Sequence, residues 1–154
     1  MLLRAVRVDL GNRLDWRICF QWHAERGEGH MKNKRSLISV VDDDESVRES
    51  LPDLLGEFGF AAQTFSSAEE FLASDFLDQT DCLILDIAMP GMTGPELQRE
   101  LAIRRRNVPI IFITAQREEA LRPRLLKLGA VECLLKPFNE TDLLQALDTV
   151  FKTG

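Results

Sequence analysis

The sequence predicts an α/β fold in which a doubly wound parallel sheet of five strands is covered by helices on both faces. Two observations support this class. From Ser36 onward, short apolar runs alternate five times with amphipathic stretches of helical period. The apolar runs show no alternation with polar residues, which is typical of strands buried on both faces. Repeated strand–helix units of this kind form parallel sheets, because each helix crosses from one strand to the next.

The five strands are expected where the apolar runs lie. Their ranges are 37–41, 61–65, 82–85, 109–113 and 131–135. The helices are expected over 45–58, over a short stretch opened by Ser66 or Ser67, and over 94–105, 117–128 and 140–151. Gly59 and Gly129 follow the first and fourth of these helices, and glycine commonly ends a helix. Asp44 is expected to cap the first helix, because acidic residues favour that position.

Two prolines fall inside expected helices. Pro52 lies midway along the first helix, where it removes a backbone hydrogen bond and clashes with the preceding turn. We expect a kink there, at a cost of about 3 kcal/mol that packing must offset. Pro123 lies within 117–128. That helix therefore either begins late, with Pro123 in its first turn, or is distorted.

Residues 1–30 do not share the pattern of residues 31–154, and we expect a domain boundary at Met31. Apolar and polar residues alternate on both sides of Gly11-Asn12, which predicts two strands and a turn. A three-residue loop would set Leu10 opposite Leu14. Two interpretations stay open. Either the chain natively starts at Met31 and the extension is disordered or extraneous, or the extension is a weak β-hairpin docked on the domain or on a partner.

The composition argues against several function classes. A formal net charge of −6 disfavours binding to nucleic acid or to an anionic membrane surface, because both require a basic patch. The one dense basic run, 104–106, is expected to be a solvated helix end. Cys19, Cys82 and Cys133 show no CxxC spacing, which favours a reducing compartment, the cytoplasm, over a disulfide framework or a zinc site. No apolar run approaches the ~20 residues of a membrane-spanning helix.

Residues with side chains suited to chemistry follow the expected strands at their carboxyl ends. They are Asp42, Asp43 and Asp44 after the first strand, Asp86 after the third, Thr114 after the fourth and Lys136 after the fifth. Ligands of doubly wound sheets bind at this edge. Carboxylates gathered there would repel one another unless a cation lies among them. Oxygen ligands without His or Cys suit Mg²⁺.

A carboxylate beside Mg²⁺ can accept a phosphoryl group as an aspartyl phosphate. Such a transfer requires charge neutralisation on the phosphoryl oxygens more than it requires acid–base chemistry. The ammonium group of Lys136 can neutralise one oxygen. The hydroxyl of Thr114 and the backbone N–H of Ala115 can bind another. The sequence therefore predicts a phosphorylation site at Asp86.

Four motifs in this order resemble the CheY-like receiver domain of two-component response regulators. They are Val40-Val41-Asp42-Asp43-Asp44, Leu85-Asp86-Ile87-Ala88-Met89-Pro90-Gly91-Met92-Thr93-Gly94, Phe112-Ile113-Thr114-Ala115 and Leu135-Lys136-Pro137-Phe138. The resemblance covers about residues 36–152 and is most similar to the FixJ-type receivers of nitrogen-fixation regulators. It implies the flavodoxin-like strand order 2-1-3-4-5.

The resemblance also implies a role for each site residue. Asp86 would be the phosphoacceptor and a ligand of Mg²⁺. The other metal ligands would be Asp43 directly, Asp42 through water or by positioning, and the backbone carbonyl of Ala88. Three residues would bind the phosphate, namely Thr114, Ala115 and Lys136. The Lys136-Pro137 peptide bond would be cis.

The function implied is a phosphorylation-dependent signalling switch, which is an enzyme only in self-catalysed phosphoryl transfer and autodephosphorylation. The phosphodonor would be a histidine kinase or a histidine phosphotransfer protein. Because the chain stops at Gly154, we expect a single-domain regulator. It would act through contacts with a downstream protein or as a phosphate relay or sink, with a homodimer through the last strand and last two helices.

Two positions depart from the family pattern. Receiver domains commonly carry Tyr or Phe three residues before the lysine, and this ring turns inward when the threonine moves. Here the position is Cys133, which is too small for that role. Ala88, two residues after Asp86, is too short to screen or orient an attacking water. The lifetime of the phosphate therefore does not follow from residue types.

Two alternative functions stay open. One is a receiver-like interaction module that keeps the fold without the phosphorylation, which Cys133 mildly favours. The other is a haloacid-dehalogenase-like, Mg²⁺-dependent phosphatase, because residues 42–46 imitate the DxDx start of that class. The phosphatase hypothesis leaves Asp86 without a role. It also lacks an acidic pair at a strand end after Lys136.

Overall fold

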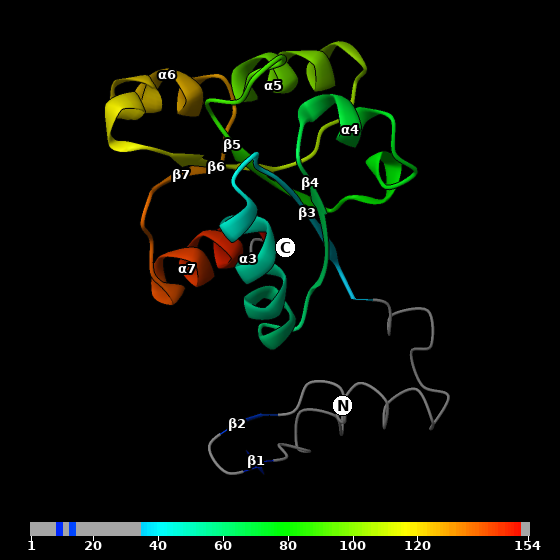
Figure 1. Cartoon of the computed structure of the whole chain (residues 1–154), viewed down its shortest axis with the longest axis vertical. Helices are drawn as coiled ribbons and strands as arrows, with labels where there is room; N and C mark the ends of the chain where they lie inside the picture. The colour runs from blue at the N-terminus through cyan, green and yellow to red at the C-terminus, as the bar shows by residue number, and fades with distance from the viewer. Residues whose placement is uncertain (1–8, 11–12, 15–34, 152–154) are drawn as a thin grey trace.

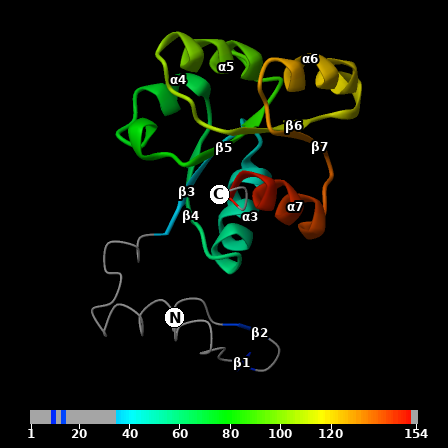
Figure 2. The ribbon, with the colours of Figure 1, turned by 180° about the vertical axis from the view of Figure 1, so that it is seen from behind.

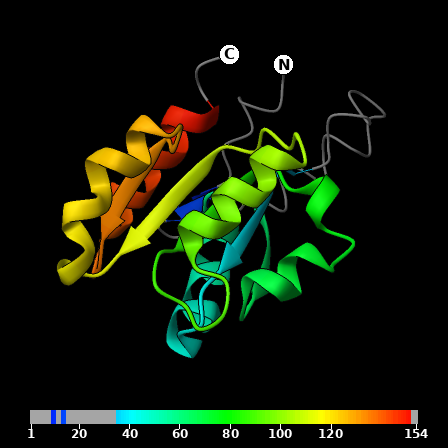
Figure 3. The ribbon, with the colours of Figure 1, turned by 90° about the horizontal axis from the view of Figure 1, so that it is seen from above.

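The computed structural model describes residues 9–10, 13–14 and 35–151. Five strands form the main sheet: β3 (Leu37–Val41), β4 (Ala61–Phe65), β5 (Cys82–Asp86), β6 (Ile110–Thr114) and β7 (Glu132–Leu135). They lie in the order β4-β3-β5-β6-β7, and every neighbouring pair is parallel. This is the predicted order 2-1-3-4-5. Figure 3 shows the arrows of β3, β6 and β7 running in a common direction.

Five α-helices cover the sheet: α3 (Glu45–Glu57), α4 (Ala68–Leu72), α5 (Gly94–Ile103), α6 (Arg122–Lys127) and α7 (Glu140–Phe151). In Figure 1, α4, α5 and α6 lie above the sheet, and α3 and α7 lie below it. The reverse view of Figure 2 gives the same two groups. The predicted doubly wound architecture is confirmed, because helices cover both faces.

Each face of the sheet has its own apolar core. On one face, Leu97 and Leu101 of α5 and Leu125 of α6 pack against the sheet around Phe112. On the other, Leu51 and Leu55 of α3 and Leu143 of α7 pack around Ile84 and Ile113. Strands β3, β5 and β6 are buried at every position, as their continuous apolar runs predict.

The helix starts follow from local chemistry. Asp44 caps α3 by accepting a hydrogen bond from the backbone N–H of Ser46, as predicted. Ser67 caps α4 in the same way with Glu70. Thr93 and Glu96 form a reciprocal capping box that begins α5, with Pro95 in the first turn. Helix α3 continues through Pro52, and the kink expected there stays a prediction.

The predicted helix over 117–128 is wrong in its first half. Residues Gln116–Leu121 form a 3₁₀ helix, η3, and α6 begins only at Arg122 with Pro123 in its first turn. Proline has no N–H to donate, so an α-helix through this point would lose a backbone hydrogen bond. The backbone N–H of Arg122 instead bonds to Glu119 three residues back. The late-starting alternative is therefore confirmed.

A short antiparallel pair lies near the N-terminus, formed by β1 (Asp9–Leu10) and β2 (Arg13–Leu14). Leu10 pairs with Arg13, so the predicted pairing of Leu10 with Leu14 is wrong by one residue. Two residues separate the strands, which is the commonest hairpin loop length. The remaining predictions for residues 1–30, including the position of Cys19, lie outside the described residues.

Three smaller features complete the description. Cys82 and Cys133 are buried and free. The basic run 104–106 is exposed and follows the end of α5. Within the described residues, no helix has both the length and the apolar character needed to cross a bilayer.

Candidate functional site

Three carboxylates gather at the carboxyl ends of two neighbouring strands of the sheet. Asp42 and Asp43 follow β3, and Asp86 ends β5. One oxygen from each lies within 4.8 Å of the others. Because β3 and β5 are parallel neighbours, their carboxyl ends lie at the same edge of the sheet. The acidic cluster expected from sequence therefore forms.

Asp42 is completely buried and is held by several directed contacts. Its Oδ1 accepts a hydrogen bond of 2.8 Å from the backbone N–H of Asp44. Its backbone carbonyl accepts a hydrogen bond of 2.9 Å from the guanidinium group of Arg48. The role of Arg48 was not foreseen, since nothing in its sequence position indicates that it folds back over the loop.

Lys136 reaches this cluster from the end of β7. Its Nζ lies 3.1 Å from Asp42 Oδ2 and 3.8 Å from Asp86 Oδ1. The contact with Asp42 is an ion pair without the angles of a hydrogen bond, so Oδ2 is buried without a directed donor. Burial lowers the pKa of Lys136, but the two carboxylates outweigh burial and leave the pKa above its usual value.

Asp86 is only 6% exposed and is poorly compensated. Burial and the neighbouring carboxylate of Asp42 raise the pKa of Asp86 to about 7, against the opposing effect of Lys136. A pKa so far above the ordinary value of 3.8 reflects first the burial of the carboxyl group and then the negative charge of Asp42, which Lys136 offsets only in part.

Thr114 and Ala115 lie beside Asp86 at the end of the adjacent strand β6. Asp86 pairs with Ile113 in the sheet, which places Thr114 one residue beyond. The Thr114 hydroxyl is buried and donates to the carbonyl of Ala115, at 3.0 Å. The N–H of Ala115, predicted to bind phosphate, donates to Glu118 Oε1 at 3.1 Å.

Glu118 is a residue that the sequence reasoning missed. The available signal was its spacing, since a glutamate three residues after a helix boundary commonly reaches back to a backbone N–H. Its carboxylate therefore occupies one of the donors on which the predicted phosphate site depends.

Gly94 fixes the distance between α5 and strand β5. Its N–H donates to the carbonyl of Ile87, at 2.9 Å. A Cβ at this position would clash with the backbone carbonyl of Asp86 and approach Phe112. Glycine is therefore required here by space, because the helix start packs directly on the end of β5.

The residues present fit a hard divalent cation. The donor atoms are all carboxylate oxygens, which Mg²⁺ prefers. The buried Asp42 Oδ2 lacks a directed donor, and the three carboxylates have only the ammonium group of Lys136 beside them. Both observations are resolved if positive charge is added between the carboxylates. The carbonyl of Ala88, in the loop after β5, stays a predicted further ligand.

Comparison with known proteins identifies the family. The model of the response regulator receiver domain matches residues 38–148. The chain belongs to this receiver family. Membership places it in a signalling family rather than a catalytic one, so the phosphatase hypothesis is set aside. Receiver domains bind Mg²⁺ at an acidic pocket, and the cluster of strand-end carboxylates is consistent with such a pocket.

The receiver is similar to several curated regulators. It is 39% identical over 132 residues to the response regulator protein TmoT of Ectopseudomonas mendocina, covering 86% of this chain and 60% of TmoT. It is 38% identical over 111 residues to the transcriptional regulatory protein FixJ of Rhizobium meliloti, covering 72% of this chain and 54% of FixJ. The chain thus spans little more than half the length of these relatives. The predicted FixJ-type resemblance is confirmed.

Solved structures agree with this assignment. The receiver matches the structure of FixJ-N with a TM-score of 0.69 at 35% identity, over 79% of this chain and 97% of that one. It matches the response regulator StyR with a TM-score of 0.70 at 44% identity, over 77% of this chain and 60% of that one.

Two site predictions concern residues next to the lysine. The Lys136-Pro137 peptide bond is cis, as predicted. Cys133 occupies the position where receivers commonly have an aromatic residue, and it is 4% exposed. Its backbone N–H donates to the side chain of Glu132, which also accepts from Arg122. At this position an ion pair therefore links α6 to β7.

Proposed function

We propose that this receiver is a phosphorylation-dependent signalling switch that accepts a phosphoryl group on Asp86. The observation that carries the proposal is the position of the Asp86 carboxylate, beside Asp42 and Asp43 on one side and the ammonium group of Lys136 on the other. The phosphodonor is a histidine kinase or a histidine phosphotransfer protein, the partners with which receiver domains interact.

In the transfer, an Oδ of Asp86 forms a bond to phosphorus while the phosphorus–nitrogen bond of the donor phosphohistidine breaks. The electron pair of that bond stays on the imidazole, which takes up a proton. Asp42, Asp43, Asp86 and the Ala88 carbonyl would hold Mg²⁺. A bound Mg²⁺ supplies positive charge to one phosphoryl oxygen.

The protein's own groups complete the neutralisation. Lys136 lies within 3.8 Å of the acceptor oxygen and can turn its ammonium group from Asp42 toward the phosphoryl group. Thr114 donates its hydroxyl to a second oxygen once it leaves the carbonyl of Ala115. The Ala115 N–H can join it when Glu118 releases that N–H. No general base is needed, because the acceptor carboxylate is ionised when a cation is bound.

The proposed output is a change in the contacts with a downstream protein. Alternatively, the receiver acts as a phosphate relay, which transfers the phosphoryl group to another protein, or as a phosphate sink, which removes it from the kinase. The cytoplasm is the proposed location, supported by two buried free thiols. A homodimer through β7, α6 and α7 is proposed as one such contact. Its support is the exposure of Leu135 on β7 and Leu144 on α7, at 39% and 40%.

The test is the intact mass of the protein after incubation with Mg²⁺ and acetyl phosphate. Wild type should gain about 80 Da, the mass of one phosphoryl group. Asp86→Asn should gain nothing. Asp53→Asn, which removes an exposed carboxylate from α3, is the matched control and should gain the same mass as wild type.

A phosphorylated histidine protein serves as the second donor. If neither donor modifies the wild type, while calorimetry shows that Mg²⁺ binds, the proposal is wrong. The phosphate-independent interaction module would then be the better description.

A further inference from the structure

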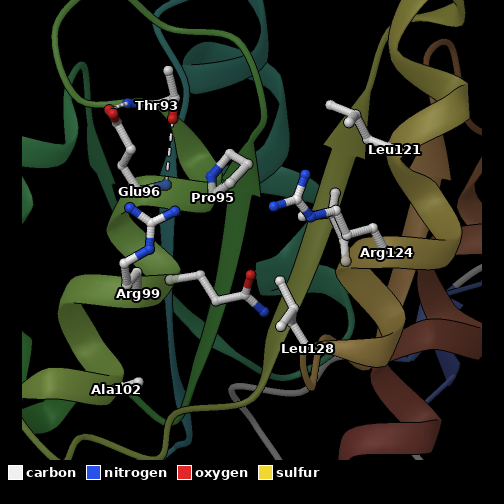
Figure 4. A pocket seen from close by; sticks show the side chains of 10 residues that line it. Thr93, Pro95, Glu96, Arg99, Ala102, Leu121, Arg124 and Leu128 are labelled. Carbon is white, nitrogen blue, oxygen red and sulfur yellow. Dashed lines mark hydrogen bonds between the residues drawn. The ribbon is translucent and has the colours of Figure 1, made fainter.

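A groove runs between α5 and the η3–α6 segment, away from the three carboxylates. Its volume is about 370 Å³, within the range of sites that hold a ligand or a peptide side chain. Figure 4 shows its two walls: Pro95, Arg99 and Ala102 come from α5, and Arg124 and Leu128 come from the α6 side. We call the surface between these two walls the α5–α6 groove.

The α5–α6 groove combines apolar surface with two arginines that have no acidic partner. Leu128 is 61% exposed and supplies apolar surface to the groove. Among the described residues, neither Arg99 nor Arg124 forms an ion pair, although five other Lys and Arg side chains do. In Figure 4 the guanidinium group of Arg124 points across the groove toward α5.

The one carboxylate among the groove's lining residues is already engaged. Glu96 accepts a hydrogen bond of 2.9 Å from the backbone N–H of Thr93 and thereby caps α5. It is therefore committed to the helix start. The net character of the groove is cationic and apolar.

This character contrasts with the rest of the protein. The segment from Gly94 to Leu128, which carries both walls, holds eight Lys and Arg against four Asp and Glu. Its net charge is +4, whereas the whole chain carries −6. A local cationic surface on an acidic protein favours an anionic occupant and repels a basic one.

We propose that the α5–α6 groove binds an acidic peptide segment of a partner protein. An aspartate or glutamate of the segment would pair with Arg124 and Arg99, and an apolar side chain would cover Leu128 and Ala102. Duplex DNA is a poorer fit, because the chain is acidic overall and a phosphate backbone offers nothing to the exposed leucine. The groove shares α6 with the proposed homodimer contact through β7, α6 and α7, but no residue of β7 or α7 lines it.

The probe is a phage-displayed library of random twelve-residue peptides, selected on the unphosphorylated full chain. The library is first depleted on Arg124→Glu. Peptides that survive depletion and enrich on wild type should be net acidic and contain a large apolar residue. Each should bind Arg124→Glu at least tenfold more weakly than wild type. No phosphodonor is present, so the result is independent of whether Asp86 accepts a phosphoryl group.

Lys127→Glu is the matched control. Lys127 lies in the same last turn of α6, is exposed, and undergoes the same change of charge without lining the groove. Enriched peptides should bind it within twofold of wild type. Leu128→Ser should weaken binding at least threefold, because the apolar contact is lost.

Four results would overturn the proposal. They are the absence of enrichment, enrichment of neutral or basic peptides, equal weakening by Lys127→Glu and Arg124→Glu, and complete competition by a random-sequence DNA duplex. Self-association that is abolished by Arg124→Glu would instead assign the groove to a second copy of this chain.

Discussion

The ammonium group of Lys136 lies nearer to Asp42 than to the acceptor, with 3.1 Å between its Nζ and Asp42 Oδ2. The lysine that would neutralise the phosphoryl group is therefore paired with a buried carboxylate before any phosphoryl group arrives. This pairing predicts a competition, because Mg²⁺ at the proposed site and the ammonium group of Lys136 would be attracted to the same carboxylates.

Lys136→Met should bind Mg²⁺ several-fold more tightly than wild type while it loses phosphoryl acceptance. Removing the ammonium group leaves Asp42 and Asp86 uncompensated, which favours the added cation. In the metal-free state the variant should be about 1–3 kcal/mol less stable, since an ion pair with a buried partner is broken. Calorimetric titration with Mg²⁺ and urea unfolding in EDTA measure the two effects. Lys127→Met, which is exposed and remote, should change neither; weaker Mg²⁺ binding by Lys136→Met would contradict the competition.

The metal-free protein should lose stability as the pH rises from about 4 to about 7. The raised pKa of Asp86, about 7 against 3.8, means that the folded protein keeps a proton that the unfolded chain releases in this range. Each rise in pH therefore favours unfolding, and the loss is complete above the folded pKa. Thermal unfolding in EDTA at pH 5 and pH 8 measures it.

Asp86→Asn isolates this contribution from other titrating groups. The variant should be more stable than wild type by about 1–3 kcal/mol at pH 8 and nearly equal to it at pH 4. Parallel pH curves for the two proteins would show that the Asp86 proton is not involved.

Gly94→Ala should destabilise the protein by about 2–3 kcal/mol, because the new methyl group would overlap the carbonyl of Asp86. The displacement of β5 from α5 should also slow phosphoryl acceptance. Gly56→Ala is the matched control. Gly56 lies inside α3 with open space around its Cβ position. The substitution should therefore raise the free energy of unfolding by about 0.5–1 kcal/mol. Urea unfolding compares them, and equal effects of the two substitutions would refute the close-packing argument.

Glu118→Ala should raise the affinity for beryllofluoride, a phosphoryl analogue, about threefold to tenfold in the presence of Mg²⁺. The Ala115 N–H would then be free, and one hydrogen bond is worth about 1 kcal/mol. Glu119→Ala removes the same charge from the next residue, whose carboxylate pairs with Arg122. If both variants tighten binding equally, the effect is one of charge and not of the N–H.

The two buried thiols should be inert in the native protein. Burial raises the pKa of Cys82 to about 12 and that of Cys133 to about 11, so thiolate is scarce at pH 8. In a Cys19→Ser background, titration with a thiol-specific disulfide reagent should detect both thiols only after unfolding. Rapid modification of Cys133 under native conditions would show that β7 opens locally.

The strands and the cluster of charged residues were predictable because their signals are local and redundant. A continuous run such as Leu37–Val41 has few interpretations other than a strand buried on both faces, and its boundaries were confirmed. The positions of Asp42, Asp86 and Lys136 followed from the rule that parallel strands end at one edge. The strand order came from the family resemblance.

The features that the sequence did not predict depend on tertiary packing or on a single backbone hydrogen-bond donor. The helical period of 117–128 continues through η3, yet one missing N–H at Pro123 separates two kinds of helix. The contact of Arg48 depends on a side-chain conformation that the sequence does not determine, whereas the contact of Glu118 could have been expected from its spacing to Ala115. The raised pKa of Asp86 likewise required the burial and distances of the folded site.

The spread of the site along the chain has a consequence for biosynthesis. Asp42 follows β3, the first strand of the main sheet in sequence, whereas Lys136 follows β7, the last one. Strand β7 lies at the edge of the sheet and pairs with β6. A nascent chain that has left the ribosome only as far as β6 would contain the acceptor and the other carboxylates without the ammonium group. If Asp86 accepts a phosphoryl group as proposed, this competence would therefore arise only after β7 and Lys136 have been synthesised.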